Sequence, residues 1–131
     1  MTDVLADTSI WIAHLRPGSA FTALDRPLAD RRVVTCGAVA AELLTGARGD
    51  TATVLRSRLR GLRWIALEEP ADWFDAGELR AVSAARGQPV ALVDTLLAVL
   101  ALRTRAQLWT LDRDFEQIAG VAPGLDLRML A

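Results

Sequence analysis

Short apolar runs alternate with longer segments of helical periodicity along the chain. Apolar and β-branched runs predict strands at 4–6, 33–35, 64–67 and 108–110, and an edge strand at 125–129. Helical spacing of apolar residues, together with start and stop signals, predicts helices at 10–15, 21–31, 37–46, 51–62, 70–86, 90–105 and 114–119. Because parallel strands need helical crossovers, this order favours a largely parallel sheet covered by helices.

Proline, glycine and hydroxyl residues mark the ends of these segments. Thr8 and Ser9 are predicted to cap the first helix, which Pro17 and Gly18 close. The helix at 21–31 is predicted to be interrupted near Pro27. These signals occur singly and form no linker, so the 131 residues (1–131) are predicted to fold as one α/β domain, an α/β/α sandwich with a short central sheet.

The basic residues change the list of possible chemistries, because all 15 of them are arginine. A chain without lysine cannot form a Schiff base or supply the lysine of a phosphate-binding loop. This excludes pyridoxal enzymes and Walker-type nucleotide hydrolases. The net charge of −1 gives no overall basic field, so any nucleic-acid site must be local.

Cys36 and His14 are the only residues of their kinds, which leaves neither an intrachain disulfide nor a zinc cluster of nitrogen and sulfur ligands. Cys36 is interpreted as a small buried residue and His14 as a residue on a helix surface. The N-terminal MTDVLADTS has no basic region before an apolar stretch, which predicts a cytoplasmic protein. The apolar stretch after Pro89 is interrupted by Asp94 and is too short to span a membrane.

Two acids lie where a helix would otherwise be apolar. Asp94 interrupts 90–100, and Glu42 interrupts 38–44. Neither has an arginine three or four residues away, so a buried carboxylate at either place needs compensation from elsewhere in the fold. Glu42 is also consistent with a solvated helix residue, and Asp94 with a structural acid bonded to backbone amides.

Three further acids follow predicted strands. Asp7 ends the first strand, and Asp112 and Asp114 follow the strand at 108–110. Each of them is equally consistent with a helix cap. The carboxyl ends of parallel strands meet at one edge of the sheet, where ligands bind in open α/β folds. Together with Asp94 and Glu42, these acids predict a shared site for a hard divalent ion such as Mg²⁺.

Other polar and aromatic residues give weaker signals. Asp72, Asp75 and Glu78 are interpreted as the solvated face of one helix. Four tryptophans are either all part of the core or partly available to a partner. They are Trp11, Trp64, Trp73 and Trp109.

Four motifs in order give the chain a resemblance to PIN-domain ribonucleases, especially the toxins of VapBC-type toxin–antitoxin pairs. They are ADTSIWI, VAAELLTG, VALVDTLLAVLAL and LWTLDRDF. The resemblance covers essentially the whole chain. It implies an RNA-cleaving enzyme that uses Mg²⁺ or Mn²⁺, a homodimer, and a VapB-like antitoxin in a hetero-oligomer, with no membrane association.

The resemblance also implies roles for particular residues. Asp7 and Asp94 would be primary metal ligands, while Glu42 and Asp112 would hold the ion or its waters. The supporting residues it indicates are Thr8, Thr110 and Asp114. The choice between Asp112 and Asp114 as the fourth acid, the number of ions, the RNA, its cleavage site and the antitoxin stay open.

Local arginines would bind the substrate, and three near predicted helix ends are candidates. They are Arg16, Arg48 and Arg86. An arginine at such a position is more often a solvated surface residue. A receiver-type phosphoacceptor domain normally needs a lysine, and a haloacid-dehalogenase-type phosphatase wants a second aspartate two residues after the first, where this chain has Ser9. The alternative that stays open is a non-catalytic PIN-like module that binds RNA or protein.

Overall fold

The five strands of the computed structural model, which describes residues 1–130, form one parallel sheet. The strands lie in the order β3-β2-β1-β4-β5, and all four neighbouring pairs are parallel. Their bounds are β1 (Val4–Ala6), β2 (Val33–Thr35), β3 (Arg63–Trp64), β4 (Gln107–Thr110) and β5 (Leu127–Met129). The predicted α/β architecture is confirmed.

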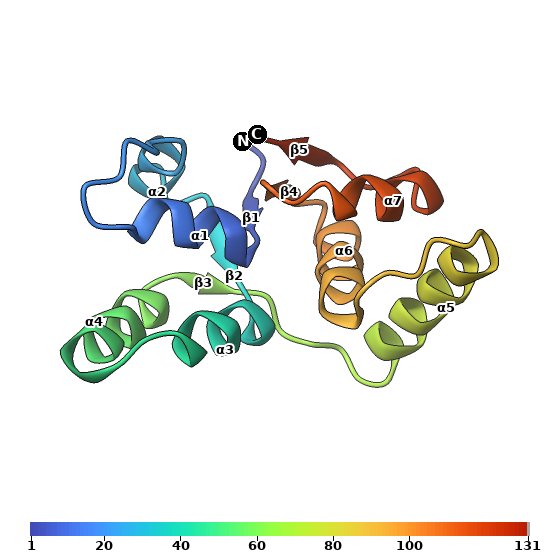
Figure 1. Ribbon diagram of the computed structural model, residues 1–131, viewed down its shortest axis with the longest axis horizontal. Coiled ribbons are helices and arrows are strands. Elements are labelled where there is room, and N and C mark those ends of the chain that lie inside the picture. Colours follow the sequence, from blue (N-terminus) through green and yellow to red (C-terminus); the bar gives the residue numbers. More distant parts are fainter. Residues whose placement is uncertain (131) are drawn as a thin grey trace.

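Helices cover both faces of this sheet. Successive residues of a strand point to opposite faces, and all three residues of β1 and of β2 are buried. In Figure 1, α1 to α4 gather on the left of the sheet and α5 to α7 on the right. The helices are α1 (Thr8–Leu15), α2 (Asp25–Ala29), α3 (Gly37–Thr45), α4 (Gly49–Arg60), α5 (Ala71–Ala85), α6 (Leu92–Thr104) and α7 (Asp114–Val121).

The predicted capping of the first helix is wrong in one respect. Thr8 and Ser9 are the first two residues of α1, and Asp7 is its N-cap. The Asp7 carboxylate accepts a hydrogen bond at 3.1 Å from the backbone N–H of Ile10, which has no partner within the helix. Capping, which was one of the two interpretations of Asp7, therefore holds.

Two predicted elements are shorter in the structure. The helix at 21–31 contracts to α2, with Pro27 in its first turn. The strand at 64–67 is replaced by the shorter β3, which begins at Arg63. The Ile65 amide still donates to Thr35 O of β2 at 2.8 Å, but the chain from Ala66 onward bonds to helix residues. Ala66 O accepts from Arg103 Nη2 at 2.6 Å, and Glu68 O accepts the Asp72 amide.

Asp72 is not on a solvated helix face, which corrects the prediction for this residue. Its side chain is 1% exposed and accepts from Arg103 Nε at 3.0 Å and Nη2 at 2.9 Å. Burial by itself raises the pKa of Asp72, but the hydrogen bonds from Arg103 and the Glu68 amide bring it below its ordinary value. The two hydrogen bonds between the Arg103 guanidinium and the Asp72 carboxylate attach the start of α5 to the end of α6. Asp75 and Glu78 are exposed as predicted.

The tryptophans divide into two pairs, so the interpretation of all four as core residues is wrong. Trp11 and Trp109 are 5% exposed and belong to the core around β1. Trp64 and Trp73 are 46% and 40% exposed. Within residues 1–130, no helix is long and apolar enough to cross a membrane.

Candidate metal-dependent nuclease site

The site begins at the carboxyl end of β1, where the sheet order reverses between β1 and β4. Asp7 follows β1 directly, and its amide donates to Trp109 O at 3.0 Å. The register pairs Ala6 with Trp109, so Asp7 and Thr110 come next on adjacent strands. Ligand crevices of open α/β sheets lie at this kind of position.

Two hydroxyl groups hold the Asp7 carboxylate. Ser9 Oγ donates to Asp7 Oδ1 at 2.6 Å, and Thr110 Oγ1 donates to Asp7 Oδ2 at 2.5 Å. The side chain is buried, and this burial raises the pKa of Asp7, as does the charge of Asp112. The hydrogen bonds from Ser9, Thr110 and Ile10 oppose that rise, since they favour the ionised form.

Glu42 reaches the site from α3. Its Oε1 accepts from Thr8 Oγ1 at 2.7 Å, across 34 residues of sequence. Thr8 stands beside Asp7 at the start of α1, so this bond ties the α3 acid to the β1–α1 junction. The residue is exposed, which agrees with the solvated interpretation and leaves its carboxylate open to a ligand.

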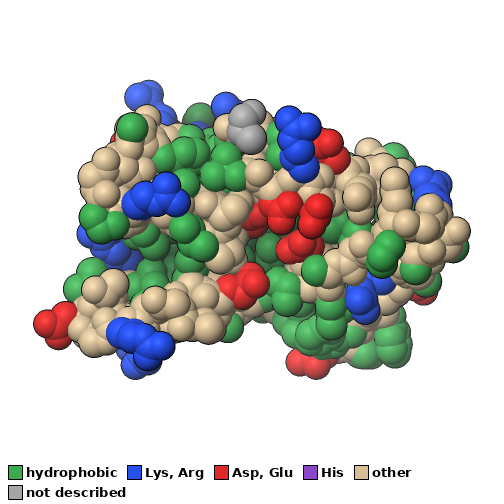
Figure 2. All heavy atoms as spheres, viewed as in Figure 1, with side chains coloured by type: hydrophobic (Ala, Val, Ile, Leu, Met, Phe, Trp, Pro, Cys, Tyr) green, Lys and Arg blue, Asp and Glu red, His purple; other side chains and the backbone are tan. Residues whose placement is uncertain are grey.

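Asp94 lies in the first turn of α6 and is half-buried. Burial and the nearby negative charges raise its pKa from the ordinary 3.8 to about 6. The charges that act on it come from four acids, Asp112, Asp7, Glu42 and Asp114. Carboxylates predicted from separate motifs are thus electrostatically coupled around Asp94, and Figure 2 shows acidic side chains gathered at the centre of one face of the molecule.

Asp112 and Asp114 lie in the turn from β4 to α7. Asp112 Oδ1 accepts the Asp114 amide at 2.9 Å, and the Asp112 amide donates to Thr110 Oγ1 at 2.9 Å. Asp114 begins α7. The N-cap of α7 is Arg113, and the Asp112 side chain, one residue earlier, accepts the amide of the first residue of the helix. The charge of Asp112 also acts on both Asp7 and Asp94.

The donor set contains only carboxylate and hydroxyl oxygens, which are the ligands that Mg²⁺ prefers. Within residues 1–130, no three His, Cys, Asp or Glu side chains are arranged to hold an ion directly. Mg²⁺ keeps several waters and binds proteins through one or two carboxylates. The residues present therefore fit a hydrated Mg²⁺ better than an ion enclosed by protein ligands.

The candidate substrate arginines are dispersed. Arg16 follows the C-terminal end of α1, at the opposite end of an eight-residue helix from Asp7, which separates them by about 12 Å. Arg48 precedes α4, and Arg86 donates from Nη1 to Gly120 O at 3.3 Å. All three are exposed, and their contact with substrate stays a prediction.

The structure shows the surroundings of the single cysteine and the single histidine. Cys36 is 2% exposed, which confirms it as a small buried residue. His14 is not a plain surface residue, because its side chain is 17% exposed and its ring meets Trp11 edge to face at 5.9 Å. It is packed against α1's own buried tryptophan.

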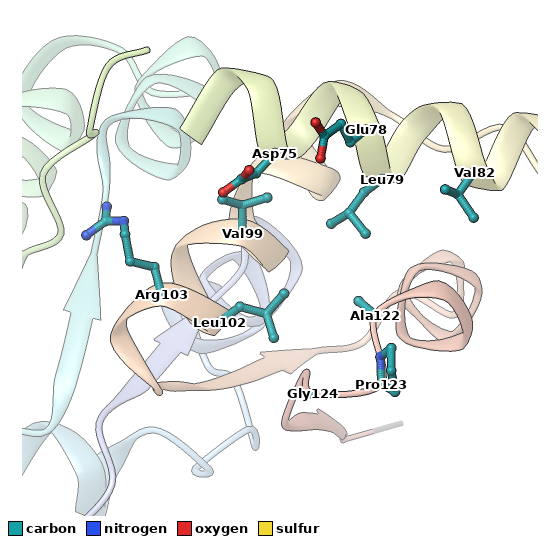
Figure 3. A pocket seen from close by; sticks show the side chains of 10 residues that line it. All are labelled: Asp75, Glu78, Leu79, Val82, Val99, Leu102, Arg103, Ala122, Pro123 and Gly124. Atoms are coloured by element: carbon teal, nitrogen blue, oxygen red, sulfur yellow. The ribbon is translucent and has the colours of Figure 1, made fainter. Parts of the chain in front are cut away.

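One cavity lies away from these acids. A pocket of about 600 Å³ opens between α5, α6 and the segment after α7, lined by apolar side chains such as Leu79, Val99 and Pro123. Figure 3 shows Asp75 and Glu78 on its α5 side. It contains none of the acids of the site, and its carboxylates would repel a phosphate backbone.

Sequence reasoning missed Ser9 as part of the site. Its hydroxyl contacts the carboxylate and also accepts the Leu111 amide at 3.0 Å, across 102 residues. The only sequence signal was its place in ADTSIWI, which is equally typical of a cap.

Comparison with known proteins agrees with this arrangement. The PIN domain family model matches residues 4–121. Ribonuclease VapC11 from Mycobacterium tuberculosis is 31% identical over 124 residues, which cover 90% of this chain and 92% of that protein. Similar folds are found in VapBC-1 from nontypeable Haemophilus influenzae, at a TM-score of 0.72 and 17% identity over 96% of both chains, and in VapBC2 from Rickettsia felis, at 0.71 and 20% over 98% of both. The chain belongs to the PIN domain family and, within it, to the VapC ribonucleases.

Proposed function

We propose that this protein is a Mg²⁺-dependent endoribonuclease that acts as the toxin of a toxin–antitoxin pair. The observation that carries the proposal is the coupling of Asp94 to Asp7, Glu42, Asp112 and Asp114 at the carboxyl end of a parallel sheet. The relatives' names, which describe ribonucleases, supply the substrate class.

The acids bind the metal ion in different ways in this proposal. Asp7 and Asp94 would contact the ion, and Glu42 and Asp112 would hold it or its waters, with Mn²⁺ as a substitute. A bound Mg²⁺ supplies a water of lowered pKa and a positive charge for the phosphate oxygens of an in-line displacement. Without a cation the acids repel the RNA backbone, which makes substrate binding depend on metal.

The chain's own hydroxyls keep these acids in place. Thr8 orients Glu42, while Thr110 orients Asp7 and accepts the Asp112 amide. Side chains already held by hydrogen bonds lose little freedom when substrate binds, which favours catalysis through positioning. Asp114 supports the arrangement because its backbone N–H donates a hydrogen bond to Asp112 Oδ1.

A protein partner is the second part of the proposal. The solved structures of similar fold include VapBC complexes, which supports a VapB-like antitoxin as a partner that would cover and inhibit the enzyme. Trp73 and Phe74, 40% and 65% exposed on α5, offer apolar surface for a homodimer.

The test is cleavage of a pool of cellular RNAs by the purified protein in Mg²⁺, Mn²⁺ or EDTA. Asp7→Asn and Asp94→Asn keep side-chain size and remove one charge each. Metal-dependent cleavage that both substitutions abolish, in folded protein, supports the proposal. Cleavage that persists in EDTA or in both variants refutes the mechanism. Metal binding without cleavage of any RNA would favour the non-catalytic RNA- or protein-binding module.

A further inference from the structure

We propose that Ser9 is a positioning residue that fixes the orientation of the Asp7 carboxylate and couples it to the Asp112 turn. This inference rests on the proposed function, since its consequence is tighter metal binding. It concerns a hydroxyl that neither the motif resemblance nor the capping pattern assigns to the site.

The geometry makes Ser9 a bridge between two loops. Its hydroxyl has one hydrogen, which it donates to Asp7 Oδ1 at 2.6 Å. Its oxygen accepts the Leu111 amide at 3.0 Å. Because the amide occupies one lone pair, the hydroxyl is held in the rotamer that donates to the carboxylate. The β1–α1 junction and the β4–α7 turn are thereby joined through a single side chain.

Thr110 makes a second bridge of the same design. It donates to the other oxygen, Asp7 Oδ2, and accepts the Asp112 amide at 2.9 Å. The two bridges thus engage both oxygens of Asp7 and two successive amides, those of Leu111 and Asp112. Without the Ser9 bridge, Asp7 Oδ1 keeps only the Ile10 amide as a donor, at 3.1 Å, and the turn that carries Asp112 loses the hydrogen bond at its Leu111 amide.

Loss of the Ser9 hydroxyl should therefore weaken metal binding and not only lower the stability of the fold. Hydrogen-bonding partners of metal ligands typically contribute about 10- to 100-fold to metal affinity or activity. Ser9→Ala removes the donor to Asp7 and also leaves the part-buried Leu111 amide without an acceptor. Ser9→Thr keeps the hydroxyl.

The chain contains a closely matched control in Ser19. Its hydroxyl donates to Ala13 O at 2.6 Å and accepts the Phe21 amide at 3.0 Å, so it makes two bonds of the same lengths, with a backbone carbonyl in place of the carboxylate. Ser19 lies beyond the far end of α1 and contacts none of the acids. Ser19→Ala therefore measures the cost of losing such a hydroxyl without touching the site.

The experiment is calorimetric titration of the metal-free protein with Mn²⁺, accompanied by thermal unfolding in EDTA and by kcat and KM for RNA cleavage. We expect Ser9→Ala to weaken Mn²⁺ binding by about 10- to 100-fold and to lower kcat more than it raises KM. We expect Ser19→Ala to bind Mn²⁺ within about twofold of the unsubstituted protein and Ser9→Thr to recover most of the affinity. Ser9→Cys, which keeps the volume but has a weakly bonding thiol, provides the same test should Ser9→Ala fail to fold.

The outcomes separate this inference from the proposed function. Equal Mn²⁺ affinity in folded Ser9→Ala, or Ser9→Cys, and Ser19→Ala would overturn the positioning role, provided that Asp7→Asn abolishes binding. No Mn²⁺ binding and no cleavage by the unsubstituted protein would overturn the proposed function itself, and the positioning role with it.

Discussion

Replacing Asp94 with asparagine should stabilise the metal-free protein. A carboxyl group whose pKa rises from 3.8 to about 6 on folding opposes folding at pH 8 by about 3 kcal/mol. Asp94 is half-buried, and solvent screening reduces this figure to about 1–2 kcal/mol. Asparagine has nearly the same shape and no charge, so it relieves both the burial of charge and the repulsion by neighbouring acids.

The sign of the pH dependence follows from the raised pKa. Between pH 3.8 and about 6 the folded protein binds a proton at Asp94 that the unfolded chain releases. The unsubstituted protein therefore gains stability from this group as the pH falls through about 6, and the gain is complete below 3.8. The advantage of Asp94→Asn should be largest at pH 8 and should disappear near pH 4.

Thermal unfolding in EDTA at pH 8 and pH 4 measures this effect. A gain of about 1–2 kcal/mol corresponds to a rise in Tm of about 3–8 °C for a domain of this size. Asp75→Asn, the same change at an exposed position of α5, is the matched control and should leave Tm nearly unchanged. Added Mg²⁺ should raise the Tm of the unsubstituted protein and have little effect on Asp94→Asn.

Either of two results would refute this reasoning about the acid cluster. If Asp94→Asn is less stable than the unsubstituted protein at pH 8 in EDTA, the carboxylate makes favourable contacts that outweigh the repulsion. A stability gain of equal size at pH 4 would also contradict it, because the repulsion should be absent there.

Three further predictions concern other residues. Arg103→Met should lower the free energy of unfolding at neutral pH by about 3–5 kcal/mol, because Asp72 is left buried and unpaired; denaturant unfolding measures this. Because the pKa of Asp72 is lowered, the stabilisation by this pair should be lost as the pH falls below about 4, in contrast to Asp94. Thr110→Val should reduce kcat/KM for RNA about 10- to 100-fold, and an unchanged rate would show that the hydroxyl is dispensable. Leu97→Ala, at a site 1% exposed, should cost about 2–5 kcal/mol by denaturant unfolding.

The separation of stability from function is visible in the two kinds of carboxylate. Asp72 is paired with Arg103 and its pKa is lowered, so its charge contributes to folding. Asp94 has no basic partner within residues 1–130 and its pKa is raised, so its charge opposes folding. A cation at the site would reverse that second effect, which is why metal binding and stability should be linked.

The sequence by itself determined the fold class and the acids. The apolar, β-branched runs at 4–6 and 33–35 favour buried strands, and the helical segments between them supply the crossovers that parallel strands need. Asp94 and Glu42 stand out because a charge in an apolar helix is conspicuous in any single sequence. Local pattern carries this information.

Only the tertiary structure decided which polar groups meet. The capping pattern of Ser9 is the same whether or not Leu111 lies beside it, and the 102 residues between them leave no periodic signal. Asp72 belongs to a helix whose next acids are solvated, and only the approach of Arg103 from α6 buries it. Burial and pairing of polar side chains depend on contacts between distant segments, and the packing of helices against the sheet sets those contacts.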